Sequence, residues 1–330
     1  MNFYYNNSYK PLFHPKVMQK DDKVYVAGNE GLAGSAIVRE LQARNFKNLV
    51  VKSRRELDLR SQGSTEEFFR AEKPDYVFMA AAEVGGIAAN LTYPADFIYD
   101  NIQMQTNVIH AAHKTGVKKL MYLGCCCAYP AQCEQPIREE CLMTGRPEIT
   151  NEPFAVAKLA GIKMCEAYRS QFGASFVSVI PANLFGPYDD FNQRNAHTIG
   201  MAIGLMHDAK LKGLESVTLA GTGAPMRDWL YSEDLAKACL FLMENYNSSS
   251  PINIGTGIGT SKNDIALAVK EVVGFKGNLV FDTTKPDGML QRVLDISKIK
   301  KLGWNVESDL KKALKFTYKW FIENYDHARR

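Results

Sequence analysis

The chain has 330 residues, of which 46% are hydrophobic and 23% charged, a composition typical of a folded globular protein. Its net charge of +4, without a dense run of Lys or Arg, does not favour a nucleic-acid or membrane partner. No apolar run is long enough to cross a bilayer, and residues 1–22 lack the apolar segment of a signal peptide. We therefore expect a cytoplasmic protein with a flexible N-terminal extension over 1–22.

Seven cysteines occur in the chain, three of them consecutive at positions 125–127. Their spacing is not that of a disulfide framework, and no Cys or His pair has the spacing of a zinc site. We expect reduced thiols and no bound metal.

Short apolar runs alternate with segments of helical periodicity through the first half of the chain. The strands expected from these runs are 23–28, 48–51, 76–80, 119–124 and 176–180. The helices expected between them are 32–46, 65–71, 94–116 and 152–172. This alternation predicts an α/β fold built on a doubly wound parallel sheet, a Rossmann-like architecture.

The pattern is less regular in the second half of the chain. The helices expected there are 198–212, 232–246, 261–273 and 310–324, with short strands between them. We expect a dinucleotide-binding domain over 23–185 and a smaller, C-terminal substrate-binding lobe over 186–330, with segments of the latter returning to the sheet.

A glycine-rich turn, Gly28-Asn-Glu-Gly31-Leu-Ala-Gly34, follows the first expected strand and opens the first helix. Glycine at these three positions permits a tight turn, lets the backbone approach a pyrophosphate, and lets the helix pack closely on the strand. Because the turn lies between a strand and a helix, it predicts dinucleotide binding; the alternative is a purely structural turn.

The end of the second strand indicates which dinucleotide is bound. An NAD site would place a carboxylate there, whereas this chain has Lys52-Ser53-Arg54-Arg55. Cations and a hydroxyl suit the 2′-phosphate of NADP, which we predict as the cofactor. The alternative is a solvated basic corner, and Glu30 in the glycine-rich turn would repel a phosphate.

Several segments carry a resemblance to a known family. They are AAAEVGGIAANLTYPADFIYDN at 80–101, TNVIHAAHKTGVKKL at 106–120, TNEPFAVAKLAGIK at 150–163, IPANLFGPYDDFN at 180–192 and FDTTKPDG at 281–288. On these segments the chain resembles the extended short-chain dehydrogenase/reductases and, among them, the GDP-L-fucose synthases. The resemblance implies a homodimer that epimerises a 4-keto nucleotide sugar at C3 and C5 and then reduces C4 with NADPH.

The resemblance also implies roles for individual residues. Cys127 matches the family's epimerase base and His197 matches its partner acid. A thiol and an imidazole, with ordinary pKa values of about 8.5 and about 6.5, can exchange protons near neutral pH. Lys158 matches the lysine that holds the nicotinamide ribose. The alternatives are buried packing for Cys127, a structural role for His197 and a surface position for Lys158.

Two positions depart from the family at the reductase chemistry. Phe154 lies where the family has the proton-donating tyrosine of Tyr-x-x-x-Lys, and Cys125 lies where it has a serine that hydrogen-bonds the substrate carbonyl. Phenylalanine cannot donate a proton, and loss of a positioned general acid typically costs on the order of 10²–10⁴ in rate. A thiol is a weaker donor than a hydroxyl, although Cys125 acting as the acid is an alternative.

The substrate-binding positions depart as well. Where the family usually has a basic residue and a tryptophan that contact GDP, this chain has Leu205 and Ala220, which weakens the case for a GDP-sugar. Asn183, Arg227 and Asp287 are retained and are predicted to bind substrate.

One further basic residue of the family is replaced by Glu83. Three hypotheses follow from these departures. The chain is an active NADP-dependent epimerase-reductase; or a divergent enzyme with weak or lost sugar reduction, either an epimerase or isomerase or a reductase or cyclase of another small molecule; or a non-catalytic NADP-binding paralogue. We favour the first, because Cys127, His197 and Lys158 are retained.

Overall fold

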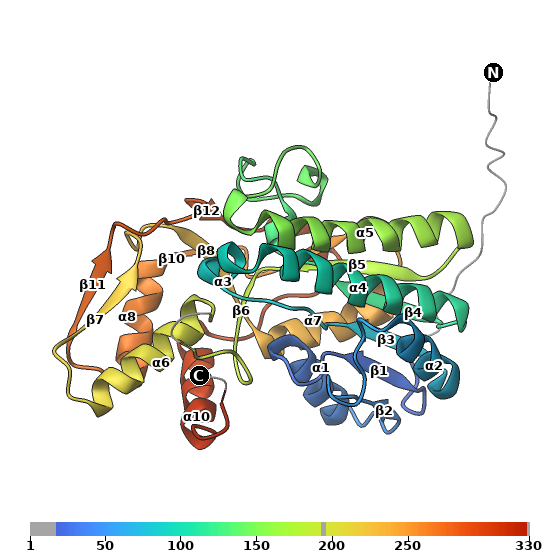
Figure 1. Cartoon of the computed structure of the whole chain (residues 1–330), viewed down its shortest axis with the longest axis horizontal. Helices are drawn as coiled ribbons and strands as arrows, with labels where there is room; N and C mark the ends of the chain where they lie inside the picture. Colours follow the sequence, from blue (N-terminus) through green and yellow to red (C-terminus); the bar gives the residue numbers. More distant parts are fainter. Residues whose placement is uncertain (1–17, 193–195, 329–330) are drawn as a thin grey trace.

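The computed structural model describes residues 18–192 and 196–328. They form two lobes, one built on a large central sheet and the other on a smaller sheet (Figure 1). The central sheet has six parallel strands in the order β2-β1-β3-β4-β5-β9. Its strands are β1 (Val24–Ala27), β2 (Leu49–Val50), β3 (Tyr76–Met79), β4 (Lys119–Leu123), β5 (Phe176–Pro181) and β9 (Ile252–Ile254). The predicted doubly wound parallel sheet is confirmed, and the five predicted strands match to within one residue at each end.

Helices cover both faces of this sheet (Figure 1). On one face α1 (Leu32–Ala43) packs against α7 (Ser232–Asn245). On the other face, the helices in contact are α2 (Gln62–Glu72), α4 (Pro94–Lys114) and α5 (Glu152–Phe172). The sequence did not predict the short helices α3 (Ile87–Thr92) and α9 (Ser297–Lys301), because one or two turns leave no clear periodicity.

The second lobe is built on β8 (Met226–Tyr231). Three short strands join it: β6 (Asn183–Phe185), β10 (Gly259–Ser261) and β12 (Gln291–Arg292). The rest of the lobe is the strand pair β7 (Ser216–Ala220) and β11 (Asn278–Asp282), with helices α6 (Thr198–Leu211), α8 (Lys262–Val273) and α10 (Leu310–Glu323). This lobe buries its own apolar cluster, separate from the core of the large sheet. Segments such as β9 return to the large sheet, while the boundary near residue 186 stays a prediction.

Residues 18–22 differ from the expected loose extension. Met18 is buried in the core of the large sheet, and the Lys118 ammonium donates to the Asp22 carboxylate at 2.8 Å. The prediction of a flexible segment is therefore wrong for residues 18–22, and residues 1–17 lie outside the described part of the chain. Within the described ranges, none of the helices combines the length and the apolar character that a membrane span requires.

A buried hydrogen-bond chain fixes α5 against the sheet. The Tyr122 hydroxyl donates to the Gln105 side-chain oxygen at 2.6 Å, and the Gln105 amide donates to the Ala157 carbonyl at 2.6 Å. Gly161 leaves room for the Tyr122 ring, with which a side chain at that position would collide. Because these groups are buried and mutually satisfied, they hold the neighbouring Lys158 at a defined place beside β4.

Candidate active site

The glycine-rich turn lies between β1 and α1, as predicted. Gly28 has φ of +83°, a conformation that favours glycine, and a Cβ there would lie 2.6 Å from the backbone nitrogen of Ala81 after β3. A Cβ at Gly34 would collide with the Gly28 carbonyl oxygen, whereas one at Gly31 would lie 3.5 Å from that oxygen. The fold itself therefore requires glycine at 28 and 34, while Gly31 leaves open space above the turn.

Gly34→Ala is expected to lower the free energy of unfolding by about 1–3 kcal/mol, because the added methyl group overpacks the turn. Gly31→Ala is the matched control: its methyl group meets only ordinary contact, so we expect unchanged stability but weaker dinucleotide binding. Urea denaturation and a dinucleotide titration of both variants separate the two effects. Equal losses of stability in the two variants would contradict the packing role of Gly34 and the open space above Gly31.

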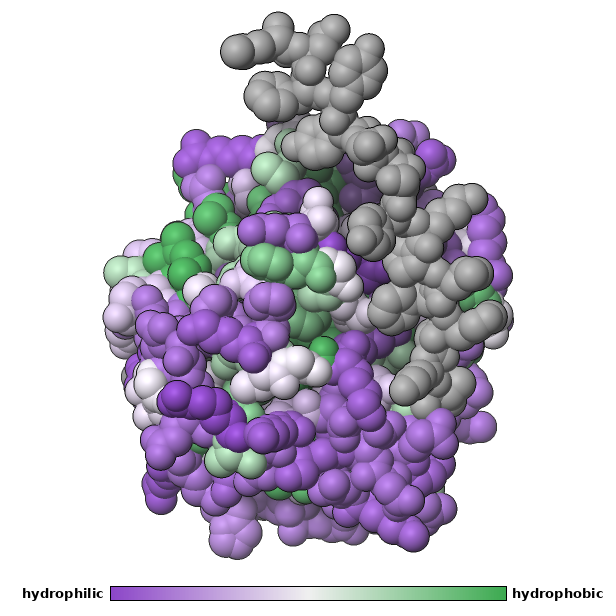
Figure 2. Space-filling view, turned by 90° about the vertical axis from the view of Figure 1, so that its right-hand side faces the viewer, coloured by the Kyte–Doolittle hydropathy of each residue, from purple (hydrophilic) through white to green (hydrophobic). Residues whose placement is uncertain are grey.

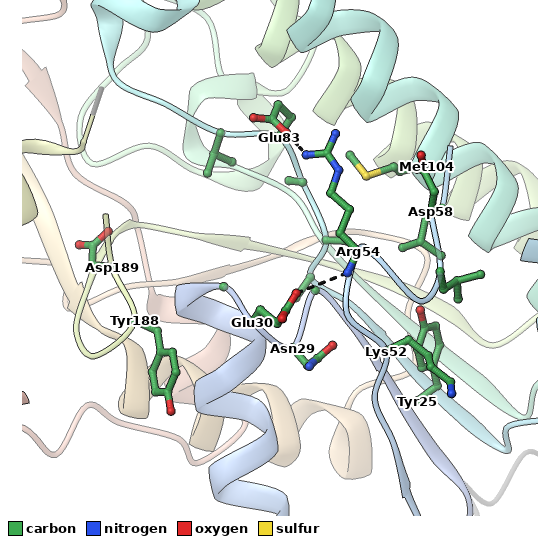
Figure 3. A pocket seen from close by; sticks show the side chains of 18 of the residues that line it. Tyr25, Asn29, Glu30, Lys52, Arg54, Asp58, Glu83, Met104, Tyr188 and Asp189 are labelled. Atoms are coloured by element: carbon green, nitrogen blue, oxygen red, sulfur yellow. Dashed lines mark hydrogen bonds and ion pairs between the residues drawn. The ribbon is translucent and has the colours of Figure 1, made fainter. Parts of the chain in front are cut away.

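A cavity of about 830 Å³ opens beside this turn, at the carboxyl ends of β1 and β3 (Figure 3). The chain leaves β1 toward β2 on one side and reaches β3 on the other, and ligands of doubly wound sheets bind at such a switch point. The turn residues Gly28–Gly31 and the segment Ala80–Val84 line it on the sheet side. This placement supports the dinucleotide interpretation over a purely structural turn.

The opposite side of the cavity comes from segments that the sequence analysis missed. Tyr188 lies across the cavity from Glu30 (Figure 3), and Trp320, Asn324 and His327 of the C-terminal segment also line it. The rings of Tyr188 and Trp320 pack at 4.7 Å between centroids. Tyr188 lies in the segment 180–192 that carries the resemblance, but no site role was assigned to it. No motif marks Trp320, Asn324 or His327, because they reach the cavity only through the packing of the C-terminal segment on the second lobe.

Two of the cations predicted for a 2′-phosphate, Lys52 and Arg54, line the cavity. The Arg54 guanidinium extends toward Glu83 and pairs with it at 3.0 Å, and it lies 3.6 Å from the Asp100 carboxylate (Figure 3). The backbone N–H of Arg54 donates to Glu30 at 3.4 Å. Exposed ion pairs of this kind contribute about 0–1 kcal/mol, so a phosphate can displace them at small cost.

Ser53 forms hydrogen bonds within its own loop. Its hydroxyl and its backbone N–H both donate to Glu56, at 2.7 and 2.8 Å, and these hydrogen bonds lower the pKa of the Glu56 carboxyl. Lys52 lies 3.9 Å from the same carboxylate. Ser53 therefore shapes the loop after β2, and its contact with a 2′-phosphate stays a prediction.

Four of the predicted catalytic positions come together at the end of β4 and the start of α5. Cys125, Cys127 and Phe154 lie in one small apolar cluster, in which the Phe154 ring packs edge-on against Phe97 with 6.1 Å between centroids. The Lys158 ammonium is 5.9 Å from the centre of the Phe154 ring. The family resemblance had implied that these four positions share one site.

Lys158 is buried, which excludes the alternative of a surface helix lysine. Its ammonium donates to the Leu123 carbonyl at 3.0 Å and lies 5.2 Å from the centre of the Tyr122 ring. Removal from water disfavours the charged form and lowers the pKa of Lys158 to about 8. Near neutral pH the side chain therefore places a positive charge beside the ring of Phe154.

Cys125 and Cys127 are joined by a disulfide, so the expectation of reduced thiols is wrong for this pair. The short turn η1 (Cys126–Ala128) brings their Cα atoms to 5.2 Å, a distance that a disulfide can span. The Cys127 N–H also donates to the Cys125 sulfur at 3.2 Å. Cys126 packs instead into the core of the large sheet as a free thiol. Sequence spacing did not reveal this pairing, because it depends on the conformation of one turn.

A cluster of cationic side chains lies beside Cys126. Arg227 and Arg292 are each 8% exposed, and burial together with repulsion from Arg292 lowers the pKa of Arg227 to about 10. Burial and the charge of Arg227 also lower the pKa of Lys262. The Asp287 carboxylate offsets part of this positive charge, and a diphosphate would fit the remainder. Of the three cations, the sequence analysis identified Arg227 alone.

Strand pairing explains why Arg292 and Lys262 were missed. β12 pairs with β8 so that Arg292 lies opposite Arg227, and β10 places Thr260 opposite the same residue, two positions before Lys262. Residues far apart in the sequence therefore converge on Arg227. No local motif marks either cation, and only the register of three short strands brings them together.

The other predicted substrate residues have structural partners. The Asn183 amide donates to the Asp228 carbonyl at 3.2 Å, and Asp287 accepts from the backbone and hydroxyl of Thr222 at 2.8 and 2.7 Å. The Asp287 carbonyl also accepts from Lys262, which places this loop beside the cationic cluster. His197 is exposed immediately before α6, on the second lobe, so its pairing with buried Cys127 stays a prediction.

The glycine-rich turn, the cavity at the switch point and the buried lysine of α5 define a dinucleotide-binding protein of the short-chain dehydrogenase/reductase class. Residues 24–255 match the NAD dependent epimerase/dehydratase family. The chain belongs to that family.

Its relatives include "GDP-L-fucose synthase 1" of Arabidopsis thaliana, 50% identical over 92% of this chain and 94% of the relative. "GDP-L-fucose synthase" of Escherichia coli is 43% identical over 93% of this chain and 98% of the relative. Among solved structures, a GDP-L-fucose synthetase from Naegleria fowleri bound to NADP is 33% identical with a TM-score of 0.89, over 95% of this chain and 96% of that one. The resemblance to GDP-L-fucose synthases is confirmed.

Proposed function

We propose that this chain is an NADP-dependent epimerase-reductase of a 4-keto nucleotide sugar, of the GDP-L-fucose synthase type. One observation carries the proposal: Cys125, Cys127, Phe154 and Lys158 converge at the end of β4, and the intervening Cys126 interacts with the buried cations Arg227 and Arg292. The relatives named GDP-L-fucose synthase match over nearly the whole chain, which supports the same reaction class.

The epimerisation step needs a base and an acid. Protons beside a ketone are acidified because the resulting carbanion delocalises as an enolate. Cys127, as a thiolate, would remove the proton at C3 or C5, and protonated His197 would return one on the other face. In this proposal the buried cations Arg227, Arg292 and Lys262 hold the diphosphate, so the sugar lies against the cysteine pair.

The reduction step needs a hydride at C4 and a proton on the resulting alkoxide. NADPH supplies the hydride when it is bound. Lys158 would hold the nicotinamide ribose and contribute positive charge near the alkoxide, and Lys52 and Arg54 would contact the 2′-phosphate. Phe154 has no proton to give, so the proton must come from Cys125 or water. Reduction is therefore expected to be slow relative to epimerisation.

The proposal is tested with GDP-4-keto-6-deoxy-mannose and the reduced protein. We expect NADPH to be oxidised in step with formation of a GDP-6-deoxyhexose, and NADH to serve less well because it lacks the 2′-phosphate. NADPH binding without turnover of any 4-keto nucleotide sugar would favour the divergent reductase or the non-catalytic paralogue. The buried cationic cluster, which fits a diphosphate, favours an enzyme of nucleotide sugars over both alternatives.

Arg292→Gln is expected to weaken binding of GDP roughly 10- to 100-fold, because it removes one charge-assisted hydrogen bond, which is worth about 1.5–3 kcal/mol. Arg138→Gln is the matched control, because Arg138 is exposed and its guanidinium lies 3.7 Å from the Asp295 carboxylate. Calorimetric titration with GDP measures both variants. Equal affinities of the two variants for GDP would show that the cationic cluster is not part of the substrate site.

We further propose a cytoplasmic homodimer formed through α4 and α5. These helices pack together and expose Tyr99, Val156 and Phe172 by 61%, 38% and 50%. The end of the molecule drawn in Figure 2 is mostly hydrophilic, with apolar side chains gathered in its upper half, level with α4 and α5 in Figure 1. Exposed apolar helix faces of this kind are typical of interfaces.

Tyr99→Asp is expected to convert the dimer into monomers, because it buries a charge at the centre of the proposed interface. Phe316→Asp is the matched control, since Phe316 is an equally exposed aromatic residue (62%) on α10. Sedimentation velocity gives the mass of each variant. A wild-type monomer, or dissociation by the Phe316 variant alone, would contradict the interface.

A further inference from the structure

We infer that the Cys125–Cys127 disulfide is a reversible redox switch that disables the proposed epimerase base. The inference rests on the proposed function of Cys127. The observation behind it is the position of the disulfide: it lies in the same small cluster as Phe154 and Phe97, at the end of β4.

The disulfide removes the chemistry that epimerisation requires. A thiolate accepts a proton through its free sulfur lone pairs and negative charge, and a sulfur in a disulfide has no such charge. Oxidation therefore removes the Cys127 base. The same bond also removes the Cys125 thiol, which could otherwise assist as a proton donor. The remaining cofactor and diphosphate contacts are on other elements, so the oxidised form keeps its binding groups.

The two sulfurs differ in their access to a reductant. Cys125 is partly exposed, whereas Cys127 is buried, with 2% of its surface accessible. A dithiol reductant would attack the Cys125 sulfur as a thiolate, break the S–S bond and release Cys127 as a thiolate. Its second thiol would then attack the mixed disulfide at Cys125. Two electrons and two protons pass to the cysteine pair, and the reductant leaves as a disulfide.

The leaving sulfur is thus the one that the mechanism needs as a base. The Cys127 N–H, which lies 3.2 Å from the Cys125 sulfur, would also stabilise negative charge at Cys125 and keep that thiol reactive toward oxidation. The neighbouring Cys126 and the distant Cys165 and Cys239 are fully buried, and burial raises the pKa of each thiol. Cys133 and Cys141 are partly exposed and lie beside each other, so the test must distinguish a 125–127 bond from a 133–141 bond.

The test uses the full chain in two states, oxidised with diamide and then reduced with dithiothreitol. Peptide mass spectrometry follows the pair, which loses two hydrogens on oxidation. Deuterium uptake from D₂O into GDP-4-keto-6-deoxy-mannose, without NADPH, follows the base. Cys125→Ser removes the partner sulfur and keeps Cys127, and Cys133→Ser is the control for removing another cysteine from the same loop.

We expect oxidation to lower deuterium uptake by wild type and by Cys133→Ser at least tenfold, and dithiothreitol to restore it. Cys125→Ser is compared only with itself, and its rate of deuterium exchange is expected to be the same after oxidation as after reduction. Uptake by oxidised wild type that equals the reduced rate, or oxidation that leaves Cys125 and Cys127 as thiols, overturns the switch. If reduced wild type and Cys125→Ser both fail to exchange, the proposed function fails instead, and the peptide masses still decide whether the pair is reversible.

Discussion

Phe154→Tyr is expected to raise the rate of ketone reduction about 10- to 100-fold in the reduced protein. The new hydroxyl would stand at the edge of the Phe154 ring, whose centre lies 5.9 Å from the Lys158 ammonium, and that charge would favour proton release. A positioned general acid typically contributes on the order of 10²–10⁴. The gain should fall short of the upper value, because Cys125 is a poor donor to the same carbonyl.

Single-turnover measurement of NADPH oxidation at saturating sugar gives this rate directly. Phe97→Tyr is the matched control, because it adds the same hydroxyl to the ring that packs against Phe154 but not to the ring beside Lys158. Only the Phe154 variant should gain. If wild type already reduces the sugar at the rate of Phe154→Tyr, then position 154 does not correspond to the proton donor.

Lys158→Met is expected to abolish measurable reduction while leaving the fold as stable as wild type or more so. Wild type carries a buried charge, and the fall of its pKa from 10.5 to about 8 corresponds to about 3 kcal/mol at pH 7. Replacement of a buried charge by an apolar side chain of similar length removes that cost, offset in part by the lost hydrogen bond to Leu123.

The sign of the pH dependence follows from the depressed pKa. Below about pH 8 both folded and unfolded states hold the proton, so the folded state bears the whole cost of the buried charge. Between about 8 and 10.5 the unfolded state binds more protons, so wild-type stability rises with pH. The stability advantage of Lys158→Met should therefore shrink across that window.

Urea denaturation at pH 7 and pH 10 measures the difference in unfolding free energy between Lys158→Met and wild type. NADPH titration measures whether the variant also binds the cofactor more weakly. Lys163→Met is the control on the same helix, because Lys163 is exposed and pairs with Glu166 at 2.7 Å. Its stability relative to wild type should not vary with pH in the same window. A Lys158 variant that is strongly destabilised at pH 7 would show that the lysine is a structural support rather than a buried functional cation.

The sheet could be predicted from the sequence because each parallel strand is a short continuous apolar run between helices of clear periodicity. α4 and α5 could be predicted from their helical periodicity. Phe154 and Lys158 lie one turn apart on α5, so their approach could also be predicted. These features depend on neighbours in the sequence, where residue pattern and spacing determine the geometry.

The substrate side could be predicted only in part. Arg227 was identified from the family resemblance, but Arg292 and Lys262 join it through the pairing of three short strands. The C-terminal wall of the cavity, with Trp320 and His327, depends on how α10 packs. The Cys125–Cys127 bond depends on one turn of backbone. In each case the determining contact is made by tertiary structure, which residue spacing does not encode.

The most direct test of the account follows deuterium in the sugar. Reduced wild-type protein is incubated with GDP-4-keto-6-deoxy-mannose in D₂O, with and without NADPH, and the sugar is analysed by NMR. We predict deuterium at C3 and C5 in both samples, with reduction at C4 only with NADPH and more slowly than the exchange. A sugar that is reduced at C4 without exchange, or that is unchanged under both conditions, would contradict the account.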